Sequence, residues 1–440
     1  MLGSNPMLKL LGLLLSSSQF ATGTPSDDSQ IVLGGYSKAT GSRPLHAVDD
    51  AVTAALARYP DPADAFVALR PEAAKKLATP RLLHVRGEEK PKWMTEGDKL
   101  RLRRERKKFV DVTDHREFYA QYADTQVEKA HLPNLTHQRL VKPLLPQISK
   151  QRMYNDLEHL TGYYNRWFGG ATGEESARWI HDQVAQIIAE SPLHSYISLE
   201  YFTHPFPQPS IIARFDPKVR NWSLPLTVLG AHQDSANYLF PLLPAPGADD
   251  DGSGTVTILE AFRVLAMNGF TPKDGPVEFH WYAGEEGGNL GSAPVARYKK
   301  ESGARIGAMV EFDATGFVAK NATESIVLVK TNADQPLTEW IAKLGEEYNA
   351  LPTLITELDP RGSSDYASYT KVGYPSAFAT EGDPSAGGFP GDYDPYMHTV
   401  KDTMYVDDET GKFSFDHMAE FCKLAIAFAI EQAGWDNVWR

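Results

Sequence analysis

The stretch LTVLGAHQD at residues 226–234 decides the fold, because a strongly apolar run ends there in a histidine and an aspartate. A helical pattern follows at 252–269, and a second apolar run, PVEFHWYAGEE, occupies 276–286. A further helical segment at 292–302 leads to a third apolar run, IGAMVEFDATG, at 306–316. Short apolar runs that alternate with amphipathic helices are typical of α/β domains. We therefore predict a three-layer α/β sandwich with a mixed, mostly parallel sheet and helices on both faces.

Toward the N-terminus from this block, the sequence predicts two paired strands and two helices. The strands are SYISLEYFTH at 195–204 and SIIARF at 210–215, with a proline-rich connection between them. Apolar residues recur at helical spacing over 153–168, and a glycine pair then provides the stop. Thr172 and Glu175 match a capping box, which predicts that the second helix begins there.

Histidine and carboxylate side chains follow each of the three apolar runs. His232 and Asp234 end the first run, Glu285 and Glu286 end the second, and Asp313 ends the third. The carboxyl ends of parallel strands meet at one edge of a sheet, where the active sites of open α/β sheets lie. We therefore expect these five side chains to converge.

Two loops add further candidates to this set. PGADDDGSG at 246–254 places three aspartates directly before a helix, and HTVKDT begins with His398. An isolated aspartate triplet would be read as a solvated helix start that the helix dipole favours. The histidine and acidic clusters at the strand ends favour a metal site instead. Mixed histidine and carboxylate ligands suit zinc, and one carboxylate can bridge two metal ions.

Five motifs, taken in order, resemble those of secreted fungal and bacterial leucine aminopeptidases with co-catalytic zinc. The motifs are GAHQDS at 230–235, APGADDDGSG at 245–254, AGEEGGNLGS at 283–292, EFDATG at 311–316 and HTVKDT at 398–403. The resemblance covers the chain from about Gln151 to the C-terminus. The stretch at 91–115 also resembles the propeptide of the fungal members. The resemblance implies the zinc exopeptidase fold.

The resemblance also implies a set of metal ligands for two zinc ions per chain. His232 and Asp313 would hold one zinc ion, and Glu286 and His398 would hold the other. Asp250 would bridge the two ions. Such a site would hydrolyse the N-terminal peptide bond of peptides and release single amino acids.

The same resemblance implies roles for four further acidic residues near the metal ligands. Glu285 would be the general base of the reaction, and Asp234 would orient the imidazole of His232. Asp249 and Asp251 would support the bridging aspartate between them.

Three other functions remain open from the sequence. A glutaminyl cyclase of similar fold uses a single working zinc ion, and the presence of both ligand pairs argues against it. A non-catalytic binding module of this fold would be expected to lack ligands, whereas all five and Glu285 are present. A carboxypeptidase would need a basic clamp for the substrate C-terminus, for which Arg361 is the candidate.

The pocket for the first substrate residue departs from the leucine-selective relatives. Where they carry Cys-Gly-Tyr-x-Cys, this chain has Asp-Pro-Arg-Gly-Ser at 359–363, without either cysteine. A pocket lined by Arg361 and Asp359 would tolerate polar or acidic first residues. Alternatively, Asp359 and Arg361 pair at the rim above an apolar floor. That floor would be built from Phe378, Tyr393 and Met397.

The N-terminal part predicts a leader and an accessory segment. Lys9 precedes the apolar run at 10–15, which is followed by small and polar residues, as in a secretory signal peptide. We expect a signal peptide at 1–23, a propeptide at 24–130 and a catalytic domain at 131–440. The propeptide region shows a helical stretch but no strongly apolar strand. From its resemblance to fungal propeptides, we expect it to act as an inhibitor or folding aid.

The net charge and the hydropathy of the chain exclude some classes of partner. With 44 basic and 57 acidic residues the net charge is −13, which argues against nucleic-acid binding. The basic run KLRLRRERKK at 99–108 is interpreted as a solvated helix face. No apolar stretch is long enough to span a membrane. The partners that the resemblance implies are peptides with a free N-terminus.

Three glycosylation sequons also favour export. Sequons occur at Asn134, Asn221 and Asn321, which fits a glycosylated, secreted, extracellular protein. The single cysteine, Cys422, excludes an intramolecular disulfide and is expected to pack in the core. We expect the chain to be a monomer.

Overall fold

The computed structural model of this chain describes residues 48–113, 116, 126–219, 221, 223–358, 363–387 and 390–436. The predicted signal peptide at 1–23 lies outside the described residues. So do Asp359 and Arg361 of the predicted pocket.

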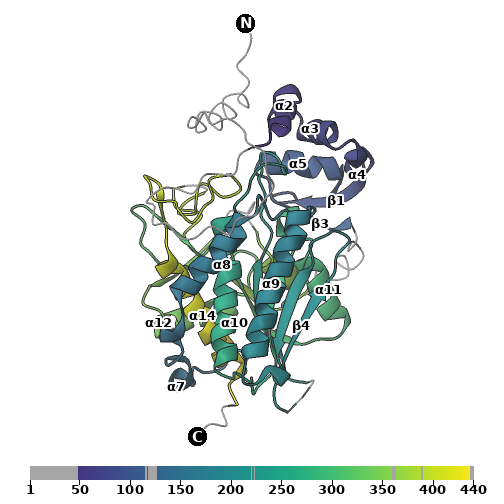
Figure 1. The fold of residues 1–440 in the computed structure, drawn as a ribbon. Coiled ribbons are helices and arrows are strands. Elements are labelled where there is room, and N and C mark those ends of the chain that lie inside the picture. Colours follow the sequence, from purple (N-terminus) through teal and green to yellow (C-terminus); the bar gives the residue numbers. More distant parts are fainter. Residues whose placement is uncertain are drawn as a thin grey trace.

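An eight-stranded mixed sheet forms the centre of the molecule (Figure 1). Its strand order is β11-β10-β12-β8-β6-β7-β5-β4. The strands are β4 (Ile197–Phe202), β5 (Ser210–Phe215), β6 (Leu226–His232), β7 (Val277–Tyr282), β8 (Ile306–Phe312), β10 (Ile326–Val329), β11 (Thr353–Thr356) and β12 (Ser376–Thr380). β6, β7, β8 and β12 run parallel, whereas β5 is antiparallel to β7 and β10 is antiparallel to β12. The predicted mixed sheet is therefore confirmed.

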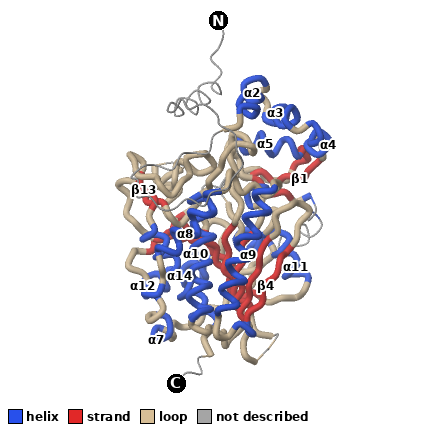
Figure 2. The backbone as a smooth tube through the Cα atoms, viewed as in Figure 1, coloured by secondary structure: helices blue, strands red, loops and turns tan. Residues whose placement is uncertain are grey.

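Helices cover both faces of this sheet, as Figure 2 shows for the blue helices in front of the red strands. The front face carries α8 (Lys150–Gly162), α9 (Ala171–Glu190), α10 (Gly254–Met267), α12 (Gln335–Tyr348) and α14 (Phe415–Ala433). The opposite face carries α11 (Ser292–Glu301) and α13 (Tyr366–Lys371). Each layer buries its own apolar core, with Phe262 and Phe428 in one and Val295 and Tyr369 in the other. The three-layer sandwich is confirmed.

Smaller elements complete this body. A short helix, α7 (Gln138–Val141), precedes α8. β9 (Phe317–Ala319) and β13 (Gly411–Phe413) form a separate antiparallel pair. Cys422 is fully buried on α14, as expected. Among the described residues, no helix combines the length and the apolar character needed to cross a lipid bilayer.

The helix α8 ends earlier than its apolar spacing predicts. The prediction carried it to Phe168, but the helix ends at Gly162. The chain then leaves the helix because the buried side chain of Arg166 donates to two backbone carbonyls, 2.8 Å from Gln233 and 2.8 Å from Gly247. These hydrogen bonds tie the segment after α8 to the loop that precedes α10.

The helix α9 and the strand pair before β6 were predicted correctly, but the capping box was not. No side chain caps α9, which begins after Gly170. The hydroxyl of Thr172 donates instead to Asn165 Oδ1 at 3.2 Å. The side chain of Thr172 therefore binds the loop in front of the helix and does not cap the helix.

Residues 48–113, here called the N-terminal segment, fold into a small unit at the top of Figure 1. Its elements are α2 (Asp50–Arg58), α3 (Pro62–Leu69), α4 (Ala74–Leu77), β1 (Pro80–Val85), β2 (Lys92–Thr95), α5 (Glu96–Arg104) and β3 (Phe109–Asp111). The strands form an antiparallel sheet in the order β2-β1-β3. The sequence shows no strongly apolar strand here, but the structure forms three short strands that were not predicted. The strands escaped notice because they are short and bury few residues, Leu83, Val85 and Phe109 among them.

Candidate metal centre and active site

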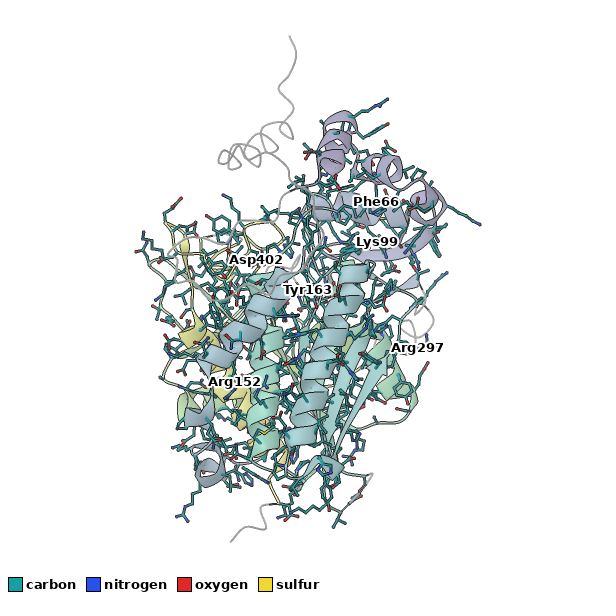
Figure 3. All side chains as sticks on the ribbon, viewed as in Figure 1. Phe66, Lys99, Arg152, Tyr163, Arg297 and Asp402 are labelled. Atoms are coloured by element: carbon teal, nitrogen blue, oxygen red, sulfur yellow. The ribbon has the colours of Figure 1, made fainter. Side chains whose placement is uncertain are left out.

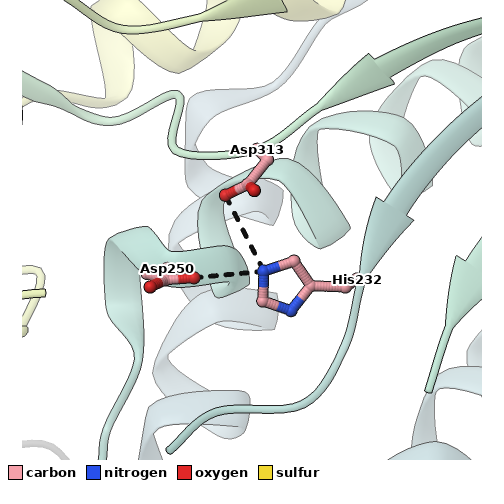
Figure 4. A group of neighbouring side chains, drawn as sticks. All are labelled: His232, Asp250 and Asp313. Carbon is pink, nitrogen blue, oxygen red and sulfur yellow. Dashed lines mark ion pairs between the residues drawn. The ribbon is translucent and has the colours of Figure 1, made fainter. Parts of the chain in front are cut away.

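The strand ends deliver their polar residues to one place. β6 ends at His232, Glu285 and Glu286 follow β7, and Asp313 follows β8. His232 Nε2 lies 3.1 Å from Asp250 Oδ1 and 3.7 Å from Asp313 Oδ1, as Figure 4 shows. Asp250 itself comes from the turn before α10. His232, Asp250 and Asp313 form the first triad of potential metal ligands.

Asp250 also belongs to a second triad, with Glu286 and His398. His398 Nε2 lies 2.6 Å from Asp250 Oδ2 and 3.5 Å from Glu286 Oε1. In each triad the candidate ligand atoms lie within 4.8 Å of one another. Since Oδ1 of Asp250 faces the first triad and Oδ2 faces the second, this carboxylate is placed to serve both.

The ligand atoms of the two triads are those that a cation would satisfy. His232 Nε2, Glu286 Oε1 and His398 Nε2 are buried and lack a hydrogen bond within the described part of the chain. Buried polar atoms without hydrogen bonds are costly and uncommon, and the close neighbours of these three are other ligand atoms of the triads. Histidine nitrogen and carboxylate oxygen are also the donors that zinc prefers in catalytic sites. The residues therefore fit two zinc ions.

The histidines determine the charge of the shared aspartate. Burial alone would raise the pKa of Asp250, but His398 and His232 outweigh that effect and hold the pKa well below its usual range. The carboxylate is therefore ionised and available as a ligand over the whole ordinary pH range. Its ionisation agrees with a bridging position between two cations.

The outer aspartates of the triplet hold the backbone of the site. Asp251 accepts hydrogen bonds from the amide of His232 at 3.0 Å and from the amide of Gly254 at 2.8 Å. Asp249 accepts one from the amide of Gly316 at 2.8 Å. The triplet thus joins the end of β6, the start of α10 and the loop after β8. This placement agrees with the supporting roles expected for both residues.

Asp234 lies where the sequence expects it, beside the first histidine ligand. Its Oδ1 is 3.4 Å from His232 Nδ1. The same carboxylate accepts hydrogen bonds from the amide of Glu285 at 3.0 Å and from the amide of Glu286 at 3.2 Å. Asp234 therefore connects a ligand of the first triad to the loop that carries both glutamates.

Glu285 is the only candidate general base that the sequence named, and it is buried at the mouth of the site. The residue is 3% exposed. Burial raises the pKa of its carboxyl, whereas the ammonium of Lys108 opposes that rise. Lys108 Nζ lies 3.4 Å from Glu285 Oε2 and 3.9 Å from Glu286 Oε2. A residue of the N-terminal segment thus contacts the base directly.

The basic run at 99–108 is not simply a solvated helix face, because two of its cations, Lys99 and Arg103, are buried. Lys99 is 1% exposed and pairs with Asp111 at 2.6 Å. Arg103 is 4% exposed and donates from Nε to the carbonyl oxygen of Glu286 at 2.6 Å. Its guanidinium also lies over the ring of Trp167, 4.9 Å from the centroid. The cations are buried because each has an acceptor or an aromatic face opposite it.

A cavity of about 390 Å³ opens beside the two triads. The three residues expected for an apolar floor, Phe378, Tyr393 and Met397, line it together with Leu358. Glu105, Arg106 and Lys108 of the N-terminal segment also line this cavity. Asp359 and Arg361, the expected polar lining, lie outside the described residues.

Three residues of the site were missed from the sequence. Asp402 accepts hydrogen bonds from the amides of Asp249 at 2.7 Å and Asp250 at 3.2 Å. It lies in the motif HTVKDT, so its place in that motif was the available signal. Lys108 and Tyr238 carry no such signal, because neither lies in one of the five motifs and each reaches the site through tertiary packing.

Comparison with known proteins agrees with this geometry. Residues 210–422 match the model of a family described as Peptidase family M28. Leucine aminopeptidase 1 of Chaetomium globosum is 37% identical over 355 residues, which cover 78% of this chain and 83% of that protein. Leucine aminopeptidase 1 of Penicillium rubens is 38% identical over 356 residues, covering 78% of this chain and 87% of that protein.

Solved structures show the same fold. The LapA aminopeptidase of Legionella pneumophila matches with a TM-score of 0.66 and 28% identity, over 82% of this chain and 96% of that chain. A glutaminyl cyclase of an Acidobacteriales bacterium matches with a TM-score of 0.51 and 19% identity, over 65% of this chain and 95% of that chain. The cyclase likeness concerns the fold alone. Because the leucine aminopeptidases are matched across most of their length at more than one third identity, the chain belongs to peptidase family M28.

Proposed function

We propose that this M28 peptidase is a two-zinc aminopeptidase that releases single residues from the free N-terminus of peptides. The observation that carries the proposal is the carboxylate of Asp250, whose two oxygens face two separate triads. The relatives named leucine aminopeptidase support the same activity. Bound zinc ions would lower the pKa of the attacking water and polarise the scissile carbonyl.

The chain's own residues supply the proton transfers and the alignment. Glu285 accepts a proton from the attacking water at its carboxylate and returns it to the leaving amine. Its raised pKa makes it a stronger base than an exposed glutamate would be. Asp234 fixes the Glu285 backbone relative to His232, so the base and a ligand keep a constant geometry. A bound zinc ion could also hold the free α-amine of the substrate, which would restrict cleavage to the chain end.

The rival functions lack a specific observation in their favour. A single-zinc cyclase would not need the second complete triad of Asp250, Glu286 and His398. A binding module would not need Glu285 buried beside those ligands. A carboxypeptidase would need a basic clamp, and the one candidate, Arg361, lies outside the described residues.

We propose an apolar preference for the first residue of the substrate. The described lining of the cavity includes Leu358, Phe378, Tyr393 and Met397. An apolar side chain that enters such a pocket gains about 1.5 to 3 kcal/mol from burial, whereas an unpaired charged one is penalised. The polar alternative depends on Arg361, so Arg361→Ala separates the two. An unchanged ratio of kcat/KM for leucine over glutamate anilides would support the apolar floor.

The activity itself is tested with matched substrates. Leucine anilide with a free α-amine should be hydrolysed, and the same anilide with an acetylated α-amine should not be. A peptide that begins with glutamine should lose that residue without release of ammonia. Ammonia release with ring closure would establish the cyclase instead, and residues released from the C-terminus would establish a carboxypeptidase.

We also propose that the chain is exported as a glycosylated monomer. Asn134, Asn221 and Asn321 are all exposed, as attached glycans require. The described part of the chain has no membrane-crossing helix. Intact mass before and after treatment with an N-glycosidase, together with light scattering on the secreted protein, tests both statements.

We further propose that the N-terminal segment keeps the enzyme latent. Support comes from Lys108, whose ammonium lies between the carboxylates of Glu285 and Glu286. The segment also narrows the cavity with Glu105 and Arg106. A substrate would have to displace these side chains before its α-amine could reach the triads.

A further inference from the structure

Tyr238 lies in the loop between β6 and α10 and contacts two residues of the second triad. Its hydroxyl donates to Glu286 Oε2 at 2.8 Å. Its ring lies parallel to the imidazole of His398, with 3.6 Å between centroids and 7° between planes. Its backbone amide donates to the carbonyl oxygen of His398 at 3.1 Å. One side chain thus constrains a carboxylate ligand and a histidine ligand together.

The hydroxyl of Tyr238 determines which oxygen of Glu286 is free. Oε2 is engaged by Tyr238, whereas Oε1 has no hydrogen bond and lies 3.5 Å from His398 Nε2. A carboxylate whose outer oxygen is held in this way presents a single oxygen to the ion. The arrangement favours coordination through Oε1 alone and prevents the carboxylate from rotating.

The ring of Tyr238 performs the same task for His398. This histidine has a φ of 61°, in the left-handed region, so its backbone conformation is one that a histidine rarely adopts unsupported. The parallel ring and the hydrogen bond from the Tyr238 amide hold it there. Nε2 of His398 is then directed at Asp250.

Tyr238 is itself held firmly. It is 8% exposed. The neighbouring Asn237 closes the loop around it, because Asn237 Nδ2 donates to the carbonyl of Pro244 at 3.0 Å and Asn237 Oδ1 accepts from the amide of Leu239 at 3.0 Å. A rigid support is what a positioning residue requires.

From these contacts we infer that Tyr238 is a positioning residue for the second metal ion, acting through Glu286 and His398. The inference rests on the two-zinc function proposed above. Residues that orient ligands in this way typically change metal affinity by about 10- to 100-fold when removed. The first triad, which Tyr238 does not contact, should be unaffected.

The test uses the full chain and zinc itself as the probe. Tyr238→Phe removes the hydroxyl and keeps the ring, and Tyr238→Leu removes both. Tyr374→Phe is the matched control, because that buried hydroxyl donates to the carbonyl of Ala304 away from the triads. Zinc affinity is measured by competition with a chelator, and the visible absorption of the cobalt-substituted protein reports the geometry of each site.

We expect wild type and Tyr374→Phe to bind two zinc ions equally well. Tyr238→Phe should bind the second ion about 10- to 100-fold more weakly and keep the first, and Tyr238→Leu should be weaker still. Tight retention of the first ion confirms that each variant is folded. Wild-type affinity for both ions in Tyr238→Phe, or equal weakening of both, would refute the role. Fewer than two ions in wild type would refute the two-zinc proposal itself.

Discussion

Adjacent glutamates in the loop after β7 point to different neighbours, and their conservative substitutions should therefore have different effects. Glu285→Gln keeps the shape of the side chain but removes the base, so kcat should fall by about 10²- to 10⁴-fold with both metal ions retained. Glu286→Gln removes a ligand charge, so the second ion should be lost more readily. Steady-state kinetics and metal analysis on both variants check this. Near-normal turnover by Glu285→Gln would mean that another group is the base.

Asp250 should be less tolerant than either glutamate, because each of its oxygens faces a different triad. Asp250→Ala is expected to release both zinc ions, whereas Asp313→Ala should mainly affect the first ion. Elemental analysis after dialysis without chelator gives the stoichiometry. An Asp250→Ala protein that still holds one ion tightly would show that the carboxylate does not bridge.

At this scale, the sequence located the residues whose chemistry is rare and missed those whose role depends on packing. His232, Asp250 and Asp313 stand at strand ends and in motifs, so their convergence followed from the alternation of strands and helices. Tyr238 and Lys108 are ordinary residue types that lie outside the five motifs. Only the tertiary contacts of the loop before α10 and of the N-terminal segment bring them to the triads.

The connection between β4 and β5 contains a titratable group that links this hairpin to the site. His204 Nε2 lies 2.8 Å from Ser210 Oγ, and Ser210 Oγ accepts from the amide of Ala283 just before the glutamate loop. The ring of His204 also stacks on Phe206, with 4.9 Å between centroids. Burial lowers the pKa of His204 from 6.5 to about 4. The neutral ring is therefore the form that the folded hairpin accommodates.

This depressed pKa predicts a loss of stability in acid. The folded state binds the proton of His204 less well than the unfolded chain does, so the contribution is present above pH 6.5 and is lost as the pH falls toward 4. The loss amounts to about 3 kcal/mol over that range. Urea unfolding at pH 7 and pH 4.5 should show a smaller difference for His204→Gln than for wild type. The same difference in both proteins would assign the acid sensitivity to other groups.

Helices and strands could be predicted from the sequence where the spacing of apolar residues stops at the same place as the element itself. β6, β7 and β8 are uniformly buried and mostly apolar, and polar residues stand at or just after their ends, which gave both their type and their ends. α8 shows the opposite case, because apolar spacing continues past Gly162 although the helix does not. The buried guanidinium of Arg166 stabilises the non-helical path, and that contact lies with loops distant in the sequence.

For the molecule as a whole, latency can be separated from a folding role with two lysines. Activity should rise when the N-terminal segment is removed, and Lys108→Ala in the full chain should recover part of that rise. Lys107→Ala should not, because Lys107 is exposed and pairs with Glu105. Specific activity before and after confirmed trimming decides the point. Equal activity of the trimmed and full chains would leave only a role in folding.

The division of the molecule was only partly accessible from the sequence. The alternation of strands and helices in the sequence predicts helices on both faces of the sheet. It does not predict where the N-terminal segment lies. The electrostatic complementarity of a basic run and an acidic body favours contact without specifying where it forms. Specific side-chain contacts determine where the two parts meet. One example is the guanidinium of Arg103, which lies over the rings of Trp167 and Phe109.

Phe66 of the N-terminal segment, labelled in Figure 3, lies against the body of the molecule, with 6.0 Å between the centroids of its ring and that of Phe240. Val52, Leu56 and Ala65 of the segment share an apolar cluster with Phe240 and Leu243 of the loop before α10. These contacts do not depend on the peptide chain that connects the two parts.

If the N-terminal segment keeps the enzyme latent as proposed, cutting that connection would change the effective concentration of the segment and not its affinity. In the intact chain Lys108 would compete with substrate as a tethered group, at a local concentration on the order of millimolar for a short linker. After the cut, the same contacts would hold the segment until dilution or digestion removed it. The enzyme would thus be activated in two stages, and the second stage would proceed faster in a large extracellular volume than in a concentrated vesicle.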